Sequence, residues 1–388
     1  MMVFATIIFW ICAAGLFYTY LGYPLHVLLW SRLFPRPVKR GPFSGSVTVM
    51  ISVFNDAARL APKLAGLFQV RGAEKIREVL VGSDASTDGI AAELAKLNEP
   101  RIRLVEFAQR RGKAAVLNDL MPLASGDVVV MTDARQPLVH DALEILLESF
   151  ADPTVGVVSG HLVFRQADNS GAATRGVGSY WSYEKTIRRA EAAFASVAGA
   201  TGALYAIRRA LLRPIPATTI LDDVAIPMLA IAQGARCIFE NDAVCYDDRA
   251  ASVATEQIRK RRTIAGNLQL VQFFPHWLLP WRNPAWWPFL CHKLLRLLSP
   301  FFLIAAFASS AALALGPTGA PHRLFFAAAF ALQSLAYLLA LAGWACDRAG
   351  VKTRLLSLPF VFAALNVTTL LAWCDALRGR YNPAWQKT

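Results

Sequence analysis

The sequence predicts an α/β domain with a mostly parallel sheet, together with transmembrane helices at both ends of the chain. Through the middle of the chain, apolar β-branched runs alternate with helical patterns, which is typical of β-α-β units and a parallel sheet. Near both ends lie long uncharged apolar stretches, and each approaches the roughly 20 residues that a helix needs to cross a bilayer.

The composition also indicates that part of the chain lies in lipid. The 388 residues are 55% hydrophobic and only 17% charged, whereas soluble domains contain roughly 45–50% apolar and 25% charged residues. A net charge of +13 suits an anionic membrane surface and phosphate-bearing ligands. Because the basic residues cluster beside the apolar stretches rather than along one helix, the pattern argues against nucleic acid as a partner.

Residues 1–31 predict an uncleaved N-terminal transmembrane helix. Residues 3–30 contain no Asp, Glu, Lys or Arg. A signal peptide has an apolar core of roughly 7–15 residues and a small-residue cleavage site, and this stretch is longer and has no obvious site. The alternative for this stretch, as for the other apolar ones, is a buried core helix.

Residues 40–270 predict a single α/β domain. Its expected strands are 47–53, 76–81, 102–105 and 128–131, and its expected helices include 57–70 and 112–121. Polar residues follow three of the strands, namely Asn55 with Asp56, Asp84, and Asp133. Since the carboxyl ends of parallel strands share one edge of a sheet, we expect these side chains at the ligand-binding edge.

Neither a dinucleotide-binding G-x-G-x-x-G after the first strand nor a P-loop is present. Any phosphate group must therefore be held in another way. The simplest way is a metal ion together with basic side chains.

Residues 271–296 predict an interfacial amphipathic segment. Several Trp residues precede Lys293 and Arg296, a pattern typical of a helix lying at the membrane surface, although an aromatic core patch remains the alternative. About three further transmembrane helices are expected within residues 297–377, followed by a tail, 378–388.

The basic residues predict the orientation. Those after the first apolar stretch, those at 259–262 and those near 293–296 and 348–354 share one side if the N-terminus faces outward. This predicts a multi-pass protein of the bacterial inner membrane with a cytoplasmic domain. Four crossings would place the tail outside, although it carries Arg378, Arg380 and Lys387. Either the tail is an exception or one apolar stretch does not cross.

An ordered set of motifs resembles the family 2 inverting glycosyltransferases, in their membrane-bound cellulose-synthase-like and hyaluronan-synthase-like branch. The motifs are Ser52-Val-Phe-Asn55-Asp56, Val81-Gly-Ser-Asp84-Ala-Ser-Thr-Asp88-Gly89, Arg111-Gly112-Lys113-Ala-Ala-Val-Leu-Asn118, Thr132-Asp133-Ala134-Arg135, Gly199-Ala-Thr-Gly202-Ala-Leu-Tyr205, Leu221-Asp222-Asp223-Val-Ala-Ile-Pro227, and Arg259…Arg262-Thr263…Gly266-Asn267. The resemblance covers about residues 45–270.

The resemblance implies a nucleotide-sugar-binding fold of the GT-A type. It implies transfer of a sugar, with inversion, from a nucleotide-diphosphate donor such as a UDP-sugar to a lipid-linked or polysaccharide acceptor at the cytoplasmic membrane face. Membrane lipids and the subunits of a polysaccharide-producing complex are the further partners that it implies.

The resemblance also assigns donor-side roles. Asn55 and Asp56 would shape the nucleoside pocket, and Asp84 would accept a hydrogen bond from the base. Lys113, with Asn118 in the same motif, would meet phosphate or support the metal. Asp133 stands where the family's D-x-D motif begins and would bind Mg²⁺ or Mn²⁺, because hard cations prefer carboxylate oxygens.

On the acceptor side, Asp223 stands where the family has its general base, with Asp222 as the acid before it. A positioned carboxylate can take the proton of an acceptor hydroxyl while the anomeric carbon is attacked. Gly202, Arg259 and Arg262 are expected near the acceptor. The ordinary structural roles for these residue types are a strand-end cap for Asp133 and a helix N-terminal acid for Asp223.

Two positions depart from the family pattern. The second acid of D-x-D is Arg135, which binds phosphate but cannot ligate a metal, so Arg135 could replace part of the metal's role. The Trp of the processive Gln-x-x-Arg-Trp motif is Thr263, which makes processive polymerisation less favoured. The alternatives are therefore a processive exopolysaccharide synthase and a catalytically inactive membrane scaffold subunit of a polysaccharide complex.

Overall fold

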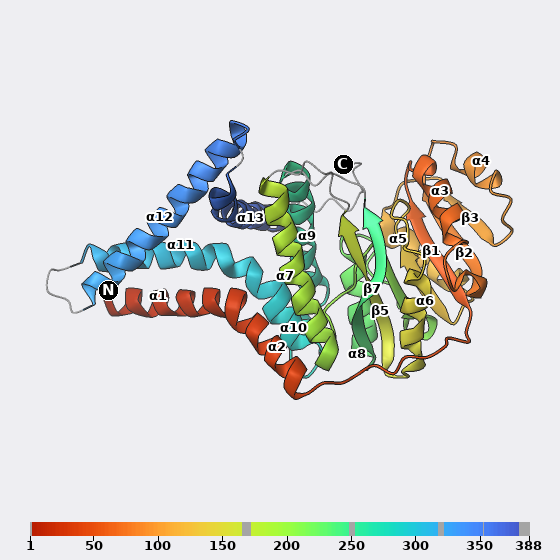
Figure 1. Cartoon of the computed structure of the whole chain (residues 1–388), viewed down its shortest axis with the longest axis horizontal. Helices are drawn as coiled ribbons and strands as arrows, with labels where there is room; N and C mark the ends of the chain where they lie inside the picture. The colour runs from red at the N-terminus through yellow and green to blue at the C-terminus, as the bar shows by residue number, and fades with distance from the viewer. Residues whose placement is uncertain (1, 165–171, 248–252, 317–321, 352, 380–388) are drawn as a thin grey trace.

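The computed structural model describes residues 2–164, 172–247, 253–316, 322–351 and 353–379. A sheet domain lies at one end of the molecule, and long apolar helices extend from it at the other (Figure 1). Two long helices stand between these parts, and their position decides how the site is assembled.

The sheet has seven strands in the order β3-β2-β1-β4-β6-β5-β7. The strands are β1 (Val47–Val53), β2 (Ile76–Asp84), β3 (Ile102–Phe107), β4 (Val128–Thr132), β5 (Val155–Phe164), β6 (Leu204–Arg208) and β7 (Arg236–Asp247). Strand β6 is antiparallel to β4 and β5, and the other neighbouring pairs are parallel. The predicted mostly parallel α/β sheet is therefore confirmed.

The central strands are apolar because helices cover both of their faces. All five residues of β4 are buried, as are six of the seven in β1, which is typical of parallel strands inside an α/β sheet. The register pairs Met50 of β1 with Met131 of β4 and Ser52 of β1 with Gly82 of β2. These three strands consequently end at the same edge.

Short helices complete the domain. They are α3 (Ala57–Leu67), α4 (Ile90–Ala95), α5 (Lys113–Leu120), α6 (Ala142–Glu148) and α8 (Asp222–Ala232), with 3₁₀ turns at Ala73–Lys75, Met121–Leu123, Ser149–Ala151, Arg209–Leu211 and Pro275–Leu278. The helix predicted at 57–70 ends at Leu67. Helix α8 begins at Asp222, so both acids of the Asp222-Asp223 pair lie in its first turn.

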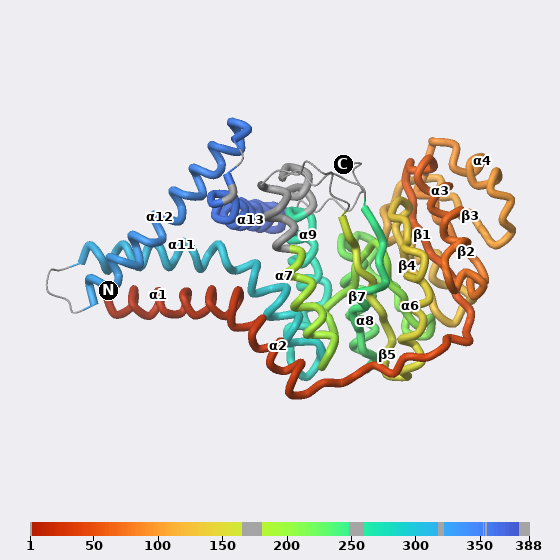
Figure 2. The backbone as a smooth tube through the Cα atoms, viewed as in Figure 1, coloured from red at the N-terminus to blue at the C-terminus, as the bar shows by residue number. Residues whose placement is uncertain are grey.

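Helices α7 (Ala172–Phe194) and α9 (Val253–Phe273) lie side by side between the sheet and the apolar helices (Figure 2). The remaining segments are α1 (Met2–Phe17), a π-helical turn (Tyr18–Gly22), α2 (Tyr23–Leu33), α10 (Trp286–Pro288), a second π-helical turn (Phe289–Leu294), α11 (Leu295–Ala314), α12 (Arg323–Arg348) and α13 (Arg354–Leu377).

Four helical segments of the described chain are long and apolar enough to cross a membrane: Met2–Leu33, Trp286–Ala314, Arg323–Arg348 and Leu355–Leu377. The second begins at Trp286, so part of the stretch predicted as interfacial, 271–296, is continuous with a candidate span. The interfacial placement of that stretch stays a prediction.

A buried polar cluster joins the N-terminal helices to α7 and to the start of α11. We call it the anchor cluster; it consists of Tyr23, Glu184, Glu191, His292 and Arg296. The two ring nitrogens of His292 each lie 2.8 Å from a carboxylate oxygen, one of Glu184 and one of Glu191. Tyr23 donates to Glu191, and Arg296 donates to Glu184 at 2.7 Å. The apolar helices and the sheet domain are thus tied through α7.

Candidate active site

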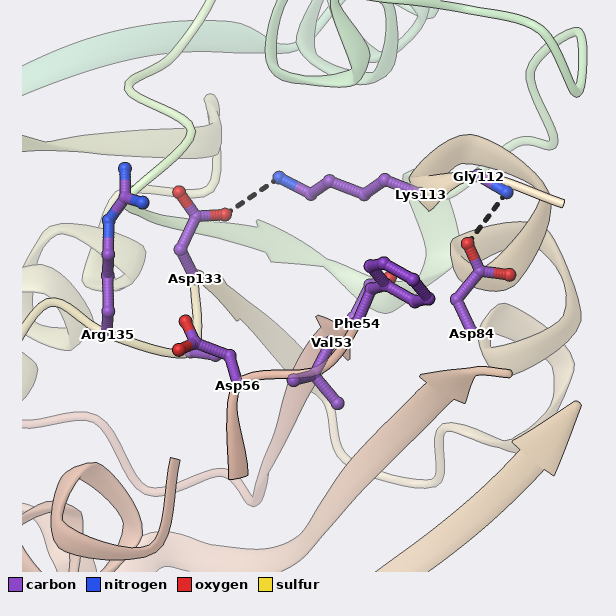
Figure 3. A pocket seen from close by; sticks show the side chains of 10 residues that line it. Val53, Phe54, Asp56, Asp84, Gly112, Lys113, Asp133 and Arg135 are labelled. Atoms are coloured by element: carbon purple, nitrogen blue, oxygen red, sulfur yellow. Dashed lines mark hydrogen bonds and ion pairs between the residues drawn. The ribbon is translucent and has the colours of Figure 1, made fainter. Parts of the chain in front are cut away.

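The carboxyl ends of β1, β2 and β4 surround a pocket, as the sequence predicted for this edge (Figure 3). Its lining residues are Ser52, Val53, Phe54, Asp56, Asp84, Gly112, Lys113, Asp133, Ala134 and Arg135. The pocket is open to solvent, and the space inside it, open mouth included, is about 470 Å³.

Asp84 fixes the loop that precedes α5. Its Oδ1 accepts a hydrogen bond from the Arg111 amide at 2.7 Å, and its Oδ2 accepts one from the Gly112 amide at 2.9 Å. Gly112 has φ +89°, a conformation that favours glycine. Both carboxylate oxygens of Asp84 are therefore engaged by the backbone, and its predicted contact with a nucleotide base remains a prediction.

Lys113 connects the two predicted functional ends of the site. Its Nζ lies 3.0 Å from Asp133 Oδ1 and 3.1 Å from Asp222 Oδ2, and the second contact is one of charge rather than a directed hydrogen bond. Burial lowers the pKa of Lys113, but the carboxylates of Asp133, Asp222 and Asp223 outweigh it and raise that pKa above its usual range. The ammonium group of Lys113 therefore stays charged, and it is paired with two carboxylates within the site.

Asp223 is part-exposed, whereas Asp222 is buried at 6% exposure. Burial, followed by the neighbouring charge of Asp222, raises the pKa of Asp223 to about 6, while Lys113 acts in the opposite direction. Asp223 Oδ2 accepts a hydrogen bond from the Gly202 amide at 3.1 Å. A carboxylate that is reachable and more basic than usual can act as a general base near neutral pH.

The loop that carries Gly202 is held by Arg188 of α7. The guanidinium of Arg188 donates to Thr201 Oγ1 at 3.0 Å, to Ser159 Oγ at 2.8 Å and to the Gly199 carbonyl at 3.3 Å. The Ala200 amide in turn donates to the backbone carbonyl of Asp223 at 2.7 Å. Arg188 thus positions the loop that contacts Asp223. Because no sequence motif marks Arg188, this role was not predicted.

Helix α9 holds the segment that leads into Asp222 and Asp223. Gln269 accepts from the Ile220 amide at 2.9 Å and donates to the Thr218 carbonyl at 2.9 Å. A Cβ on Gly266 would lie 2.6 Å from Leu221 Cγ, so the helix approaches this segment closely only because residue 266 is glycine. Gln269 was also missed, although Gly266 lies in a recognised motif.

The turn that carries Asp133 and Arg135 rests on Lys63, which is buried at 5% exposure. Lys63 Nζ donates to Thr132 Oγ1 at 3.0 Å and to the Gln136 carbonyl. Burial lowers the pKa of Lys63 to about 8. Lys63 therefore stabilises the turn that carries Asp133 and Arg135. No sequence motif predicts this role.

Two of the predicted donor-binding residues have structural contacts instead. Asn118 donates to the Ile215 carbonyl at 2.7 Å and accepts from the Ile215 amide at 3.0 Å, away from the pocket lining. Asn55, at φ +50°, accepts from the Thr87 amide at 2.7 Å, and it too lies outside the lining. Asp56 does line the pocket. Asn55 and Asn118 thus hold loops in the structure, and the donor-binding roles of all three residues stay predictions.

Arg135 lines the pocket beside Asp133, with its Nη2 3.6 Å from Asp247 Oδ2 (Figure 3). Among the described residues, no group of three His, Cys, Asp or Glu side chains could hold a metal. The residues present still fit a divalent ion of the magnesium type, which proteins often bind through one carboxylate plus substrate phosphates. Asp133 would supply that carboxylate here.

The basic run of α9 is only partly described. Arg262 lies one turn before Gly266, the residue at which α9 meets the segment leading to Asp222. The side chain of Arg259 falls outside the described residues. The acceptor-side roles of both arginines stay predictions, whereas Gly202 does contact the predicted base.

Comparisons with known proteins agree with this geometry. Residues 48–215 match the family model described as Glycosyl transferase family 2. Poly-beta-1,6-N-acetyl-D-glucosamine synthase of Staphylococcus aureus (strain COL) is 23% identical over 205 residues, which cover 52% of this chain and 49% of that protein. An N-acetylglucosaminyltransferase of Bradyrhizobium elkanii is 29% identical over 121 residues, covering 30% of this chain and 66% of that protein.

Among solved structures, the fold is similar to that of the mannosyltransferase PcManGT from Pyrobaculum calidifontis, in complex with GDP-Man and Mn²⁺. The TM-score is 0.71 at 24% identity, covering 96% of this chain and 99% of that one. The chain spans about half the length of the Staphylococcus aureus relative. The chain therefore carries a family 2 glycosyltransferase domain with a GT-A-like fold.

Proposed function

We propose that the protein is an inverting glycosyltransferase that acts at the cytoplasmic face of a bacterial inner membrane. It moves a sugar from a nucleotide-diphosphate donor to a lipid-linked or glycan acceptor. The family 2 domain supports the chemical class, and the candidate membrane spans support the location.

The observation that carries this proposal is the position of Lys113 between Asp133 and Asp222, next to the more basic Asp223. At one end of this arrangement, cations can bind a diphosphate. At the other end, a base can take the proton of a hydroxyl. The strand-end pocket and the first turn of α8 bring both ends together.

In the proposed reaction, Asp223 takes the proton of the acceptor hydroxyl as its oxygen bonds to the anomeric carbon. The bond from that carbon to the diphosphate oxygen breaks, and the nucleoside diphosphate leaves with the electron pair. Attack opposite the leaving group inverts the configuration. Lys113 and Arg135 stabilise the charge that develops on the diphosphate, because preorganised cations are strongly effective in a partly desolvated site.

Asp133 is the residue that would hold a divalent ion, with the diphosphate supplying further oxygens. Such an ion, when bound, neutralises negative charge on the departing diphosphate. The Lys113 contact to Oδ1 of Asp133 orients that carboxylate.

The names of the relatives suggest which donors to test first. Two of the similar curated proteins are named for N-acetylglucosamine, and the solved structure contains GDP-Man. We therefore expect UDP-N-acetylglucosamine or a GDP-sugar to be the most informative first donors. A processive synthase is the second candidate, favoured by the name of the Staphylococcus aureus relative.

The test is a screen of radiolabelled UDP-, GDP- and dTDP-sugars with membranes that contain the protein, with Mg²⁺ or Mn²⁺. We expect one donor to label a lipid or glycan product, and we expect Asp223→Asn to reduce that labelling by roughly 10²–10⁴-fold with nucleotide binding retained. Asp141→Asn, at a half-exposed position outside the pocket, is the matched control. Long products would favour processive synthesis over single transfer.

The rival is an inactive scaffold subunit. It predicts that no sugar is transferred or hydrolysed from any donor with either metal. It also predicts that Asp223→Asn changes nothing except, at most, stability.

A further inference from the structure

We propose that α13 does not cross the membrane but lies along the membrane face that bears the sheet domain, in contact with the lipids of that leaflet. The described chain then crosses three times, and the end of α13 lies on the same side as the domain. This inference does not depend on the enzymatic activity proposed above.

The far end of the apolar bundle, away from the sheet domain, is defined by α1, α11 and α12. Met2 lies next to Gly316, just beyond α11. Arg323, the first residue of α12, donates to the Ala314 carbonyl at the end of α11 at 3.0 Å. The rings of Phe9 and Phe326 pack edge to face. The start of α1, the end of α11 and the start of α12 therefore share one end.

Helix α12 returns from that end toward the domain. Gln333 donates to Ser310 at 3.1 Å, and further along α12 the ring of Tyr337 packs against Phe307. As the numbering rises on α12, its partners on α11 fall, so the two helices are antiparallel. The C-terminal part of α12, including Gly343, consequently lies at the near end, beside the domain.

Both ends of α13 contact that same near end. At its start, the Leu356 carbonyl lies 2.6 Å from where a Cβ on Gly343 would be. Toward its end, Trp373 Nε1 donates to the Leu297 carbonyl in the first turn of α11 at 2.9 Å. Asp375 then pairs with Arg261 of α9 through two contacts of 2.5 and 2.7 Å.

A helix of 24 residues is about 36 Å long. If α13 crossed the bilayer, its last turns would lie beside the far end, near Met2 and Gly316. Instead they lie against α9, which packs on the segment leading to Asp222. The middle of α13 agrees with this placement, since Phe362 packs against Tyr20 in the π-helical turn that follows α1. Figure 1 shows α13 nearly end-on, whereas α1 and α11 run along the long axis.

The apolar composition of α13 is explained by contact with lipid in this position. Its outward side chains include Leu355, Leu358 and Leu377, which are 90%, 70% and 80% exposed. Exposing such side chains to water costs free energy. A helix that lies in the membrane interface can instead bury its apolar side in the acyl region. Placing Arg378 on the domain side also satisfies the preference of basic residues for the cytoplasmic face.

The test uses three single-cysteine variants of the full chain, made after replacement of its six native cysteines. Lys96→Cys reports the domain side, Leu315→Cys reports the far end, and Arg378→Cys reports the end of α13; all three positions are exposed. A membrane-impermeant maleimide is applied to right-side-out and inverted vesicles. We expect positions 378 and 96 to be labelled in the same vesicles and position 315 in the opposite ones. Labelling of 378 together with 315 would overturn the proposal.

A second measurement avoids the cysteine replacements. The native full-length chain is fused at its C-terminus to green fluorescent protein, which fluoresces only in the cytoplasm, or to alkaline phosphatase, which is active only outside. Protease treatment of intact cells shows whether the sheet domain is protected inside the cell. If the domain stays uncut, we expect fluorescence and no phosphatase activity. Phosphatase activity with a protected domain would show that α13 crosses.

Discussion

The donor pocket and the surroundings of Asp223 are built in different ways. The pocket is lined by residues between Ser52 and Arg135, carried on the ends of three adjacent strands and the start of one helix. Asp223 is positioned by Gly202, by Arg188 on α7 and by Gln269 on α9, which are brought together from separate parts of the chain. A strand end needs only its neighbours to place a side chain, whereas the base needs helices that also pack on the membrane segments.

Lys113 forms ion pairs with both regions, one with Asp133 and one with Asp222. Its substitution is therefore expected to have the largest effect on both. We expect Lys113→Met to lower kcat/KM by roughly 10²–10³-fold, since it removes a cation aimed at developing charge. It also leaves the carboxylates of Asp133 and Asp222 uncompensated, so Tm should fall. The measurement is steady-state transfer with a thermal melt, and exposed Lys96→Met is the control.

Lys113→Arg sharpens the same test. The guanidinium keeps the charge but not the compact geometry, so activity should lie between those of the wild type and Lys113→Met. If Lys113→Met retained full activity, the ammonium would serve stability alone, and the two regions would be chemically independent.

Arg188→Met tests whether the surroundings of Asp223 depend on α7. We expect kcat to fall by about 10-fold with little change in donor KM, because the substitution releases the loop that donates to Asp223 while leaving the pocket intact. The neighbouring exposed Arg189→Met should be silent. A change in donor KM instead of kcat would show that Arg188 acts on the donor pocket and not on the surroundings of Asp223.

The pH dependence of transfer tests the surroundings of Asp223 separately from the donor pocket. Transfer needs the deprotonated form of Asp223, so with a pKa of about 6 the rate should rise through pH 6 and level off above it. Asp222→Asn removes a negative neighbour that raises this pKa, so the midpoint should move to lower pH, by up to about one unit. The measurement is kcat/KM from pH 4.5 to 8.5. A midpoint that stays in place would mean that Asp223 is not the titrating base.

Gly202→Ala has the smallest expected effect. The added Cβ would lie 3.0 Å from Asp223 Oδ2, so the carboxylate must shift by a few tenths of an ångström. We expect kcat to fall a few-fold while nucleotide affinity, measured by calorimetry, stays unchanged. An equal loss of donor affinity would show that this loop also shapes the pocket.

Sequence patterns predicted the donor side well because its chemistry follows the strand ends. Strands at 47–53, 76–81, 102–105 and 128–131 and the helix beginning at Lys113 all appear, with Asp84 and Asp133 at the expected edge. Asp223 lies in the first turn of α8, the position that its ordinary structural role also describes. Local periodicity and short motifs are sufficient for such features.

The supporting side chains could not be predicted, because their roles come from long-range packing. Arg188 lies on a helix whose sequence shows no motif, and it contacts residues 11 to 29 positions away in the chain. Lys63 and Thr132 are 69 residues apart. Asn118 shows the converse, since it lies inside a recognised motif but bonds to the backbone of Ile215, 97 residues away.

The anchor cluster gives α7 a further property. Glu184, Arg188 and Glu191 follow the i, i+4, i+7 spacing of a single helix face. The two glutamates belong to the anchor cluster and contact His292, while Arg188 holds the loop at Asp223. Four residues of helix correspond to about 6 Å of rise. The residue spacing along α7 thus fixes where the loop that contacts Asp223 lies relative to the anchor cluster. Any movement of the apolar helices that carries the anchor cluster with it would therefore also displace that loop.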